Sequence, residues 1–379
     1  MPDLAHIVGQ DAAIGQLMRA MDSNRMPHAY LFVGPEGVGR RTTAAALANL
    51  LLCETPVAAH ASAGAVRQAC GRCQDCRTFA AGTHPDFHLI YKELARFHDD
   101  PGVRSRVMQD LGIDVIRSFL IAPANRSSAR GRGKVFLVRE AELLSAAAQN
   151  ALLKTLEEPP PLVTVILIVQ RREQVLPTIL SRCHIVNFGP LPRDFVTGQL
   201  RQSGVAAPEA RFWAAFTQGS IGRSLTLWRQ GYYAIQQDIL DRLANSPLVG
   251  DPELGEHLVK IMETLADDLV KQSKTDSGAS MSKNLASRQA AGALLELIAS
   301  AYQDALRLSC DRQAASSQLI HADQFHVIEA FHRRFQPHQL ASIIEQLSDF
   351  EELLWRNVNP KVVWENVAIT CSTAAPLRL

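Results

Sequence analysis

Over the first half of the chain, short apolar runs typical of buried strands alternate with segments that have the hydrophobic pattern of helices. Four short, mostly apolar runs have the length of buried strands, at residues 29–33, 86–91, 134–138 and 163–169. Three segments have helical character instead, at 42–53, 114–120 and 146–158. The last helix is stopped by three consecutive prolines at 159–161. Strands that alternate with helices predict an α/β domain built on a parallel sheet.

The pattern changes after about residue 190, because no further strand is predicted. Residues 192–245 suggest short helices that are interrupted by a glycine-rich stretch at 219–222. Longer amphipathic helices are expected at 252–272, 285–310 and 323–371. We therefore expect three domains, which are an α/β domain over 1–190 and helical domains over 191–246 and 247–379.

Composition agrees with a globular chain of this size. The 379 residues are 47% hydrophobic and 20% charged, which suits two or three domains. Lys and Arg number 39 against 38 Asp and Glu, and this balance argues against a strongly basic protein that coats nucleic acid unaided. No run of 18 apolar residues or signal peptide is visible, so a cytoplasmic location is expected.

Four cysteines have the spacing of a metal site. Cys70, Cys73 and Cys76 lie three residues apart, and Cys53 lies 17 residues before the first of them. Four thiolates suit tetrahedral Zn²⁺ in a closed, structural site, which we place in an inserted module over about 53–76. The alternative is a loop of reduced thiols. The other three cysteines are expected to be buried, and they are Cys183, Cys310 and Cys371.

The segment 34–41 follows the first predicted strand and has the glycine spacing of a phosphate-binding loop, G-x-x-x-x-G-K-[ST]. Arg40 replaces the Lys that reaches phosphate, and Arg41 replaces the hydroxyl residue that binds Mg²⁺. Weak nucleotide or phosphate binding would use the backbone amides and Arg40, at the positions Gly34, Gly37, Gly39 and Arg40. The alternative is a loop that keeps its turn for structural reasons alone.

A second departure follows the strand at 134–138. Arg139 stands where a metal-binding Asp is expected, although Glu140 remains beside it. Two independent losses of Mg²⁺ ligands predict that the chain does not hydrolyse ATP, because phosphoryl transfer needs the metal to neutralise developing charge.

Three further strings carry a resemblance. They are H-I-V-G-Q at 6–10, N-A-L-L-K-T-L-E-E-P-P at 150–160 and L-P-T-I-L-S-R-C at 176–183. Together they resemble the AAA+ subunits of bacterial clamp loaders, and the four cysteines fit the zinc module of that family. The resemblance covers residues 5–190, and beyond them only helical character and length agree.

The resemblance implies an AAA+ P-loop domain, then a small helical lid over 191–246 and an all-α collar over 247–379. It implies a non-hydrolysing subunit of the DNA polymerase III holoenzyme, a DNA-directed DNA polymerase (nucleotidyltransferase), that helps to load the sliding β clamp onto primed DNA. The implied partners are the ATPase (gamma/tau) and delta subunits, which bind the ATP, as well as the β clamp and the DNA.

The same resemblance makes Arg182 an arginine finger that completes the ATP site of a neighbouring subunit in trans. The alternative is a surface arginine paired with a carboxylate. Lys154, Glu157 and Glu158 are expected either at an inter-subunit contact or in ion pairs along an exposed helix face. Arg223 beside Gly222 receives no nucleotide role.

Two other functions stay open. The first is a self-sufficient clamp-loader ATPase motor with an unconventional arginine-containing P-loop. The second is a zinc-dependent DNA-binding protein. The densest basic stretch would either contact DNA or a neighbour or simply be solvated, and it contains Arg126, Arg130, Arg132 and Lys134.

Overall fold

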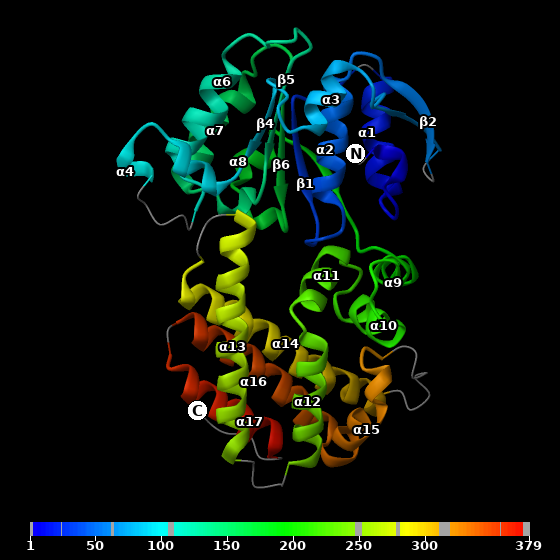
Figure 1. Cartoon of the computed structure of the whole chain (residues 1–379), viewed down its shortest axis with the longest axis vertical. Coiled ribbons are helices and arrows are strands. Elements are labelled where there is room, and N and C mark those ends of the chain that lie inside the picture. Colours follow the sequence, from blue (N-terminus) through cyan, green and yellow to red (C-terminus); the bar gives the residue numbers. More distant parts are fainter. Residues whose placement is uncertain are drawn as a thin grey trace. The chain divides into compact units, whose positions relative to one another are not determined.

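A computed structural model describes the chain over residues 3–23, 25–61, 64–104, 110–246, 252–277, 281–310, 319–356 and 358–373 (Figure 1). The chain forms two compact units. The first contains Met1–Pro192 and Gly219–Gly222, and the second contains Arg193–Gln218 and Arg223–Leu379. The predicted division of the helical part into a lid over 191–246 and a collar over 247–379 stays a prediction.

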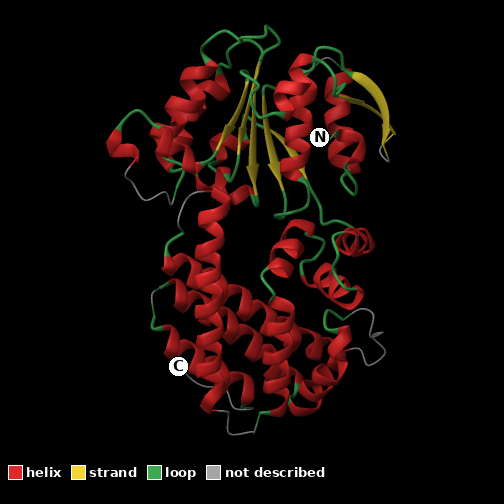
Figure 2. Ribbon diagram, in the orientation of Figure 1, coloured by secondary structure: helices red, strands yellow, loops and turns green. Residues whose placement is uncertain are grey.

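The first unit is built on a five-stranded parallel sheet with the order β4-β5-β6-β1-β7. Its strands are β1 (Ala29–Val33), β4 (Phe87–Ile90), β5 (Lys134–Val138), β6 (Val163–Val169) and β7 (His184–Asn187). In the register of the central strands, Leu31 lies between Leu167 and Ile185. Figure 2 shows the strands fanned between helices, which explains why β1 and β5 are buried throughout.

The helices of this unit are α1 (Asp11–Asp22), α2 (Arg40–Leu52), α3 (Gln74–Ala80), α4 (Pro101–Arg104), α5 (Ile113–Ile116), α6 (Ala122–Ala124), α7 (Ala146–Glu157) and α8 (Pro177–Leu180). A π-helical turn over Arg117–Ile121 joins α5 to α6. Short 3₁₀ turns occupy Leu4–His6, Lys92–Phe97, Ala141–Leu143 and Arg172–Gln174. Leu152 of α7 and Ile179 of α8 are fully buried in the same apolar core as Leu31.

The four predicted strands are confirmed, but three strands were not predicted. β7 escapes the pattern because it is short and only Val186 of its residues is buried. The others form an antiparallel hairpin of β2 (Val57–Ala61) and β3 (Gly64–Gln68), which lies between Cys53 and Cys70 in the sequence. Its alanines and polar residues give no strong strand signal.

The second unit is helical in every part that the structure describes. Its elements are α9 (Arg193–Gln202), α10 (Ala207–Phe216), α11 (Ile221–Arg229), α12 (Tyr232–Asn245), α13 (Pro252–Ser277), α14 (Lys283–Cys310), a 3₁₀ turn (Ala322–Gln324), α15 (Phe325–Arg334), α16 (Pro337–Trp355) and α17 (Pro360–Ser372). The predicted segment 323–371 is divided at Pro337 and Pro360, each of which begins a new helix.

Two further results concern the helices. No helix in the described ranges is long and apolar enough to cross a membrane. Cys371 is buried as predicted, and Cys183 is only partly buried. The prediction for Cys310 is wrong, because this residue is exposed at the end of α14.

Candidate functional site

The predicted P-loop joins β1 to α2 and is crowded by backbone from two other segments. Gly34 has a φ of 154°, and a Cβ there would lie 2.3 Å from the Phe188 carbonyl oxygen. Gly222 approaches the loop as well, since its amide donates to the Gly37 carbonyl at 3.3 Å. A Cβ on Gly222 would lie 3.0 Å from the Gly37 Cα. The glycines therefore serve close backbone packing.

Gln10, the last residue of the 6–10 string, ties this loop to the segment after β7. Its side-chain amide nitrogen donates to the carbonyls of Val38 at 3.0 Å and Gly189 at 2.8 Å. Its oxygen accepts from the Gly189 amide at 3.2 Å. Because Gln10 is buried, these bonds hold the P-loop in place from inside the fold.

Arg40 does not extend from the loop as a phosphate-binding side chain would. It is only 7% exposed, and its guanidinium donates to the Val169 carbonyl at the end of β6. Burial lowers the pKa of Arg40, while the nearby Glu142 and Glu36 carboxylates oppose this shift. The charge at the lysine position of the motif is thus already engaged by the protein itself.

The two positions that would carry Mg²⁺ ligands are both cationic. Burial lowers the pKa of Arg41, and the charge of Arg139 lowers it further. The Glu140 carboxylate acts in the opposite direction. Cationic side chains therefore stand at both positions where the motif comparison expects oxygen ligands.

Arg182 lies just after α8, in a turn anchored by the fully buried Ile179. Its side chain is 34% exposed and forms an ion pair with Glu157 of α7, with Nη2 and Oε1 2.6 Å apart. Nη1 donates to the Thr178 carbonyl at 2.9 Å and to the Ser181 hydroxyl at 3.1 Å. Glu157 therefore pairs with Arg182, and the expected ion pair with Lys154 along the helix is not made in the described structure.

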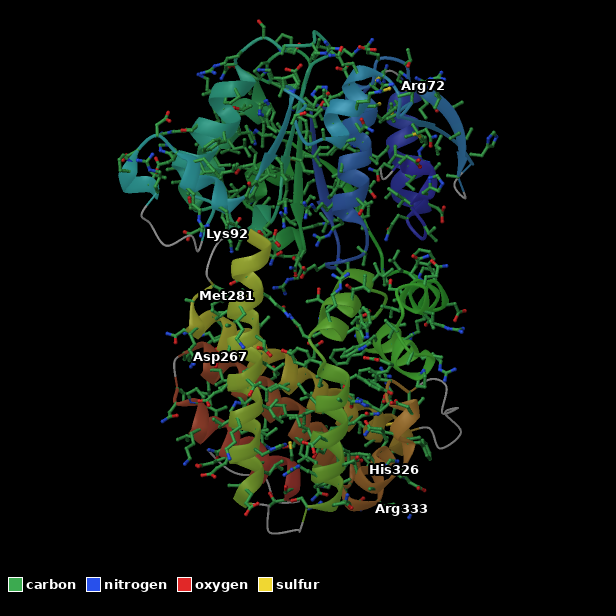
Figure 3. All side chains as sticks on the ribbon, in the orientation of Figure 1. Arg72, Lys92, Asp267, Met281, His326 and Arg333 are labelled. Carbon is green, nitrogen blue, oxygen red and sulfur yellow. The ribbon has the colours of Figure 1, made fainter. Side chains whose placement is uncertain are left out.

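The four cysteines of the predicted metal site come together. The sulfur atoms of Cys53, Cys70, Cys73 and Cys76 all lie within 4.8 Å of one another. Two of the separations are 3.9 Å, for Cys53 and Cys73, and 4.0 Å, for Cys70 and Cys76. Tetrahedral Zn²⁺ with bonds of about 2.3 Å needs sulfurs about 3.8 Å apart, so the donor set fits this ion. Arg72, labelled in Figure 3, belongs to the turn that carries Cys70 and Cys73.

Backbone amides are already directed at the sulfurs. The amides of Cys70, Cys73 and Cys76 donate to the sulfurs of Cys53, Cys70 and Cys73 respectively, each at 3.3 Å. Hydrogen bonds from Thr55 and from backbone amides lower the pKa of Cys70 to about 5, whereas burial raises the pKa of Cys53 and of Cys76. A bound divalent cation would supply the positive charge that keeps all four thiolates ionised.

Carboxylates beside the cysteines bind the basic loop before β5. Asp75 is 2% exposed and accepts from the Arg130 Nε at 2.7 Å, with the His84 ring 3.5 Å away. Asp86, also buried, accepts the backbone amides of Ala129 and Arg130, both at 2.8 Å. The sequence offered one clue to this network, the T-H-P-D string at 83–86, but its role depends on contacts that sequence alone does not reveal.

The remaining basic residues of that loop are also used within the unit. Arg132 donates to the Cys53 carbonyl at 3.1 Å. Lys134 is buried and donates to the Pro123 carbonyl at 2.7 Å. Arg126, Arg130 and Arg132 are exposed, whereas Lys134 is buried, so the prediction of a solvated loop fails for Lys134, and a contact with DNA or a neighbour stays a prediction.

Two family models match the chain, and together they span well over half of it. The model described as "DNA polymerase III, delta subunit" matches residues 9–192, and the one described as "DNA polymerase III, delta subunit, C terminal" matches residues 257–372. The chain belongs to the DNA polymerase III delta-prime family. The expected fold class, a parallel P-loop-type α/β sheet followed by a helical region, is confirmed.

Individual relatives agree with this family. DNA polymerase III subunit delta' of Escherichia coli is 30% identical over 62% of this chain and 65% of its own length. That of Pseudomonas aeruginosa is 38% identical over 44% of each chain. The Escherichia coli subunit tau is 37% identical over 52% of this chain and 27% of its own length. The chain thus matches less than two thirds of the length of each of these relatives.

Arg223, for which the sequence predicts no nucleotide role, contacts other residues of the helical unit. Its Nη1 donates to Glu296 Oε1 at 2.9 Å, and its guanidinium lies 5.5 Å from the centre of the Phe216 ring. These contacts hold Arg223 within the second unit.

Proposed function

We propose that this chain is a subunit of a replicative clamp loader that does not hydrolyse ATP itself. It supplies Arg182 as an arginine finger to the ATP site of a neighbouring ATPase subunit. The observation that carries the proposal is a contrast between two motifs of the same domain. The S-R-C turn keeps a partly exposed arginine, while the chain's own P-loop has Arg40 bound to Val169 and arginines at both Mg²⁺ positions.

An arginine finger requires only one correctly placed guanidinium group from this chain. A guanidinium placed against a transferring phosphoryl group stabilises the charge of the transition state and can raise the rate about 10³- to 10⁵-fold. The partners would be a gamma/tau-type ATPase subunit, which holds the nucleotide, and a delta subunit. The assembled ring would act on the sliding β clamp and primed DNA, within the DNA polymerase III holoenzyme.

The deciding experiment uses the full chain alone and in a complex reconstituted with its ATPase and delta partners. Alone, the chain should show no Mg²⁺-dependent ATP hydrolysis, with or without primed DNA. In the complex, Arg182→Ala should lower DNA-stimulated ATP turnover and clamp loading while complex assembly persists. Arg171→Ala, which removes another exposed arginine of the same unit, is the matched control and should leave both unchanged.

Unaltered turnover in the Arg182→Ala complex would refute the finger. Hydrolysis by the isolated chain would instead favour the alternative, a self-sufficient motor with an unconventional P-loop. A zinc-dependent DNA-binding protein is less well supported, because the numbers of basic and acidic residues are nearly equal and Arg130 is paired with the carboxylates of Asp75 and Glu54.

The cysteine module has a structural role in this proposal. The four sulfurs leave no open coordination position for a substrate when one tetrahedral ion is bound, so zinc would act by stabilising the fold. Its position would be held by β2–β3 on one side and by the Asp75–Arg130 contact on the other.

A further inference from the structure

We propose that Glu157 is a positioning residue for the Arg182 finger, which it orients through the ion pair between α7 and the turn after α8. This inference rests on the function proposed above, and it identifies the Glu157 carboxylate as the group that sets the direction of the Arg182 side chain. Glu157 acts only through Arg182, so it is not itself placed against the reacting phosphate.

The first support is how the guanidinium is held. Its Nη1 donates to the Thr178 carbonyl and the Ser181 hydroxyl, which belong to the same turn as Arg182. Among the described residues, only Glu157 contacts it from another element, and its Oε1 lies 2.6 Å from Nη2. The Nε–H and one Nη2–H make no hydrogen bond within the described residues, so these donors remain for an acceptor outside the chain.

The second support is that α7 contacts the finger segment at two points. The Gln149 side-chain oxygen accepts from the Leu176 amide at 2.8 Å, just before α8 begins. Glu157 pairs with Arg182 just after α8 ends. These two residues of α7 are eight positions apart, which is about 12 Å along a helix. The helix therefore fixes both the start of the finger segment and the direction of the finger itself.

The third support comes from the position of Glu157 in its helix. Glu157 is the last residue of α7, where the helix dipole favours a cation over an anion. Glu158 follows it at the C-cap. The Glu157 carboxylate is unfavourable at the end of its own helix, and an ion pair with a partly exposed arginine adds little to the stability of the fold. Its effect on Arg182 therefore explains its presence better than fold stability does.

The experiment compares Glu157→Gln with wild type in the reconstituted complex. The quantity measured is the Arg182-dependent ATPase rate, which is the rate of each complex minus the rate of the Arg182→Ala complex. We expect Glu157→Gln to lower this rate about fivefold, the effect of one partly exposed ion pair on the transition state. The KM for ATP should stay unchanged, because the neighbouring subunit binds the nucleotide. Glu157→Asp, which keeps the carboxylate on a shorter stem, should recover part of the rate.

Two controls separate positioning from general damage. Glu173→Gln removes another exposed carboxylate of the same unit and should leave the rate unchanged. The double variant Glu157→Gln/Arg182→Ala should be no slower than Arg182→Ala alone, because a positioning residue has no effect without the group that it positions. Thermal unfolding of each variant checks that the unit stays folded.

A full or increased Arg182-dependent rate in Glu157→Gln would overturn the positioning role while leaving the finger intact. An increase would mean that the carboxylate restrains the arginine. If Arg182→Ala itself had no effect on turnover, the proposed finger and the positioning role would both fall. The two failures are therefore distinguishable in one set of assays.

Discussion

Two arginines of the first unit, Arg40 and Arg182, lie in opposite environments. Arg40 turns inward and is bound by the Val169 carbonyl, so its charge serves the fold. Arg182 stays partly exposed and keeps two N–H groups unused within the described structure. The side-chain chemistry is identical, and only the environment decides which arginine remains available to a partner.

Two buried titratable residues of the second unit give opposite dependences of stability on pH. Burial lowers the pKa of His321 from 6.5 to about 3, so its contribution is complete above pH 6.5 and is lost as the pH falls toward 3. Burial raises the pKa of Asp304 from 3.8 to about 6, so its contribution is complete below pH 3.8 and is lost as the pH rises through 6.

Substituting each residue should therefore reveal slopes of opposite sign. Between pH 6 and 4, the free energy of unfolding of Asp304→Asn should fall relative to wild type by about 1.4 kcal/mol for each unit that the pH decreases. That of His321→Gln should rise relative to wild type by a similar amount. Urea unfolding at pH 4, 5 and 6 measures both, and parallel profiles for the variants and wild type would contradict the two assignments.

At the scale of elements, the cysteine module and the basic loop form one polar assembly. α3 contributes Asp75, the segment before β4 contributes His84 and Asp86, and the loop before β5 contributes Arg130. Each buried carboxylate has a cationic or amide partner, as a group removed from water requires. The assembly connects the proposed metal site to the edge of the sheet.

Breaking this connection should destabilise the first unit. Arg130→Gln removes the charged partner of the buried Asp75 and should lower the free energy of unfolding by more than a matched change elsewhere in the loop does. Arg126→Gln, an exposed arginine of the same loop, should change it by less than about 0.5 kcal/mol. Denaturant unfolding compares the two variants, and equal effects would show that the Asp75 contact contributes little.

At the scale of the whole molecule, the division into two compact units predicts two cooperative unfolding transitions. Elemental analysis should find about one Zn per chain. A strong chelator should lower the transition temperature of the first unit and leave that of the second unchanged, because the four cysteines all belong to the first.

Calorimetry with matched variants tests this assignment. Cys73→Ser should reproduce the effect of the chelator, whereas Cys310→Ser, at an exposed cysteine of the second unit, should have no effect. Full metal content and unchanged stability in Cys73→Ser would refute a structural metal site. A common shift of both transitions would contradict the independence of the two units.

Much of this molecule can be predicted because the signals are local. The strands β1, β5 and β6 are apolar runs bounded by turns, Arg41 and Arg139 can be located by their spacing from these strands, and the cysteine spacing is a short-range pattern. β7 and the β2–β3 hairpin carry no comparable pattern. Their strand conformation depends on pairing with β1 and with each other, so it appears only in the folded chain.

The sequence by itself determined which chemical groups the chain carries: an arginine in an S-R-C turn, arginines in place of metal ligands and four thiols at zinc-binding spacing. Only the tertiary structure decided how these groups are used. Arg40 meets Val169 across 129 positions, and Arg130 meets Asp75 across 55. Arg182 meets Glu157 only because α7 and α8 pack together. A side chain's charge is a property of its residue type, whereas its partner is set by which distant elements the sheet and its helices bring side by side.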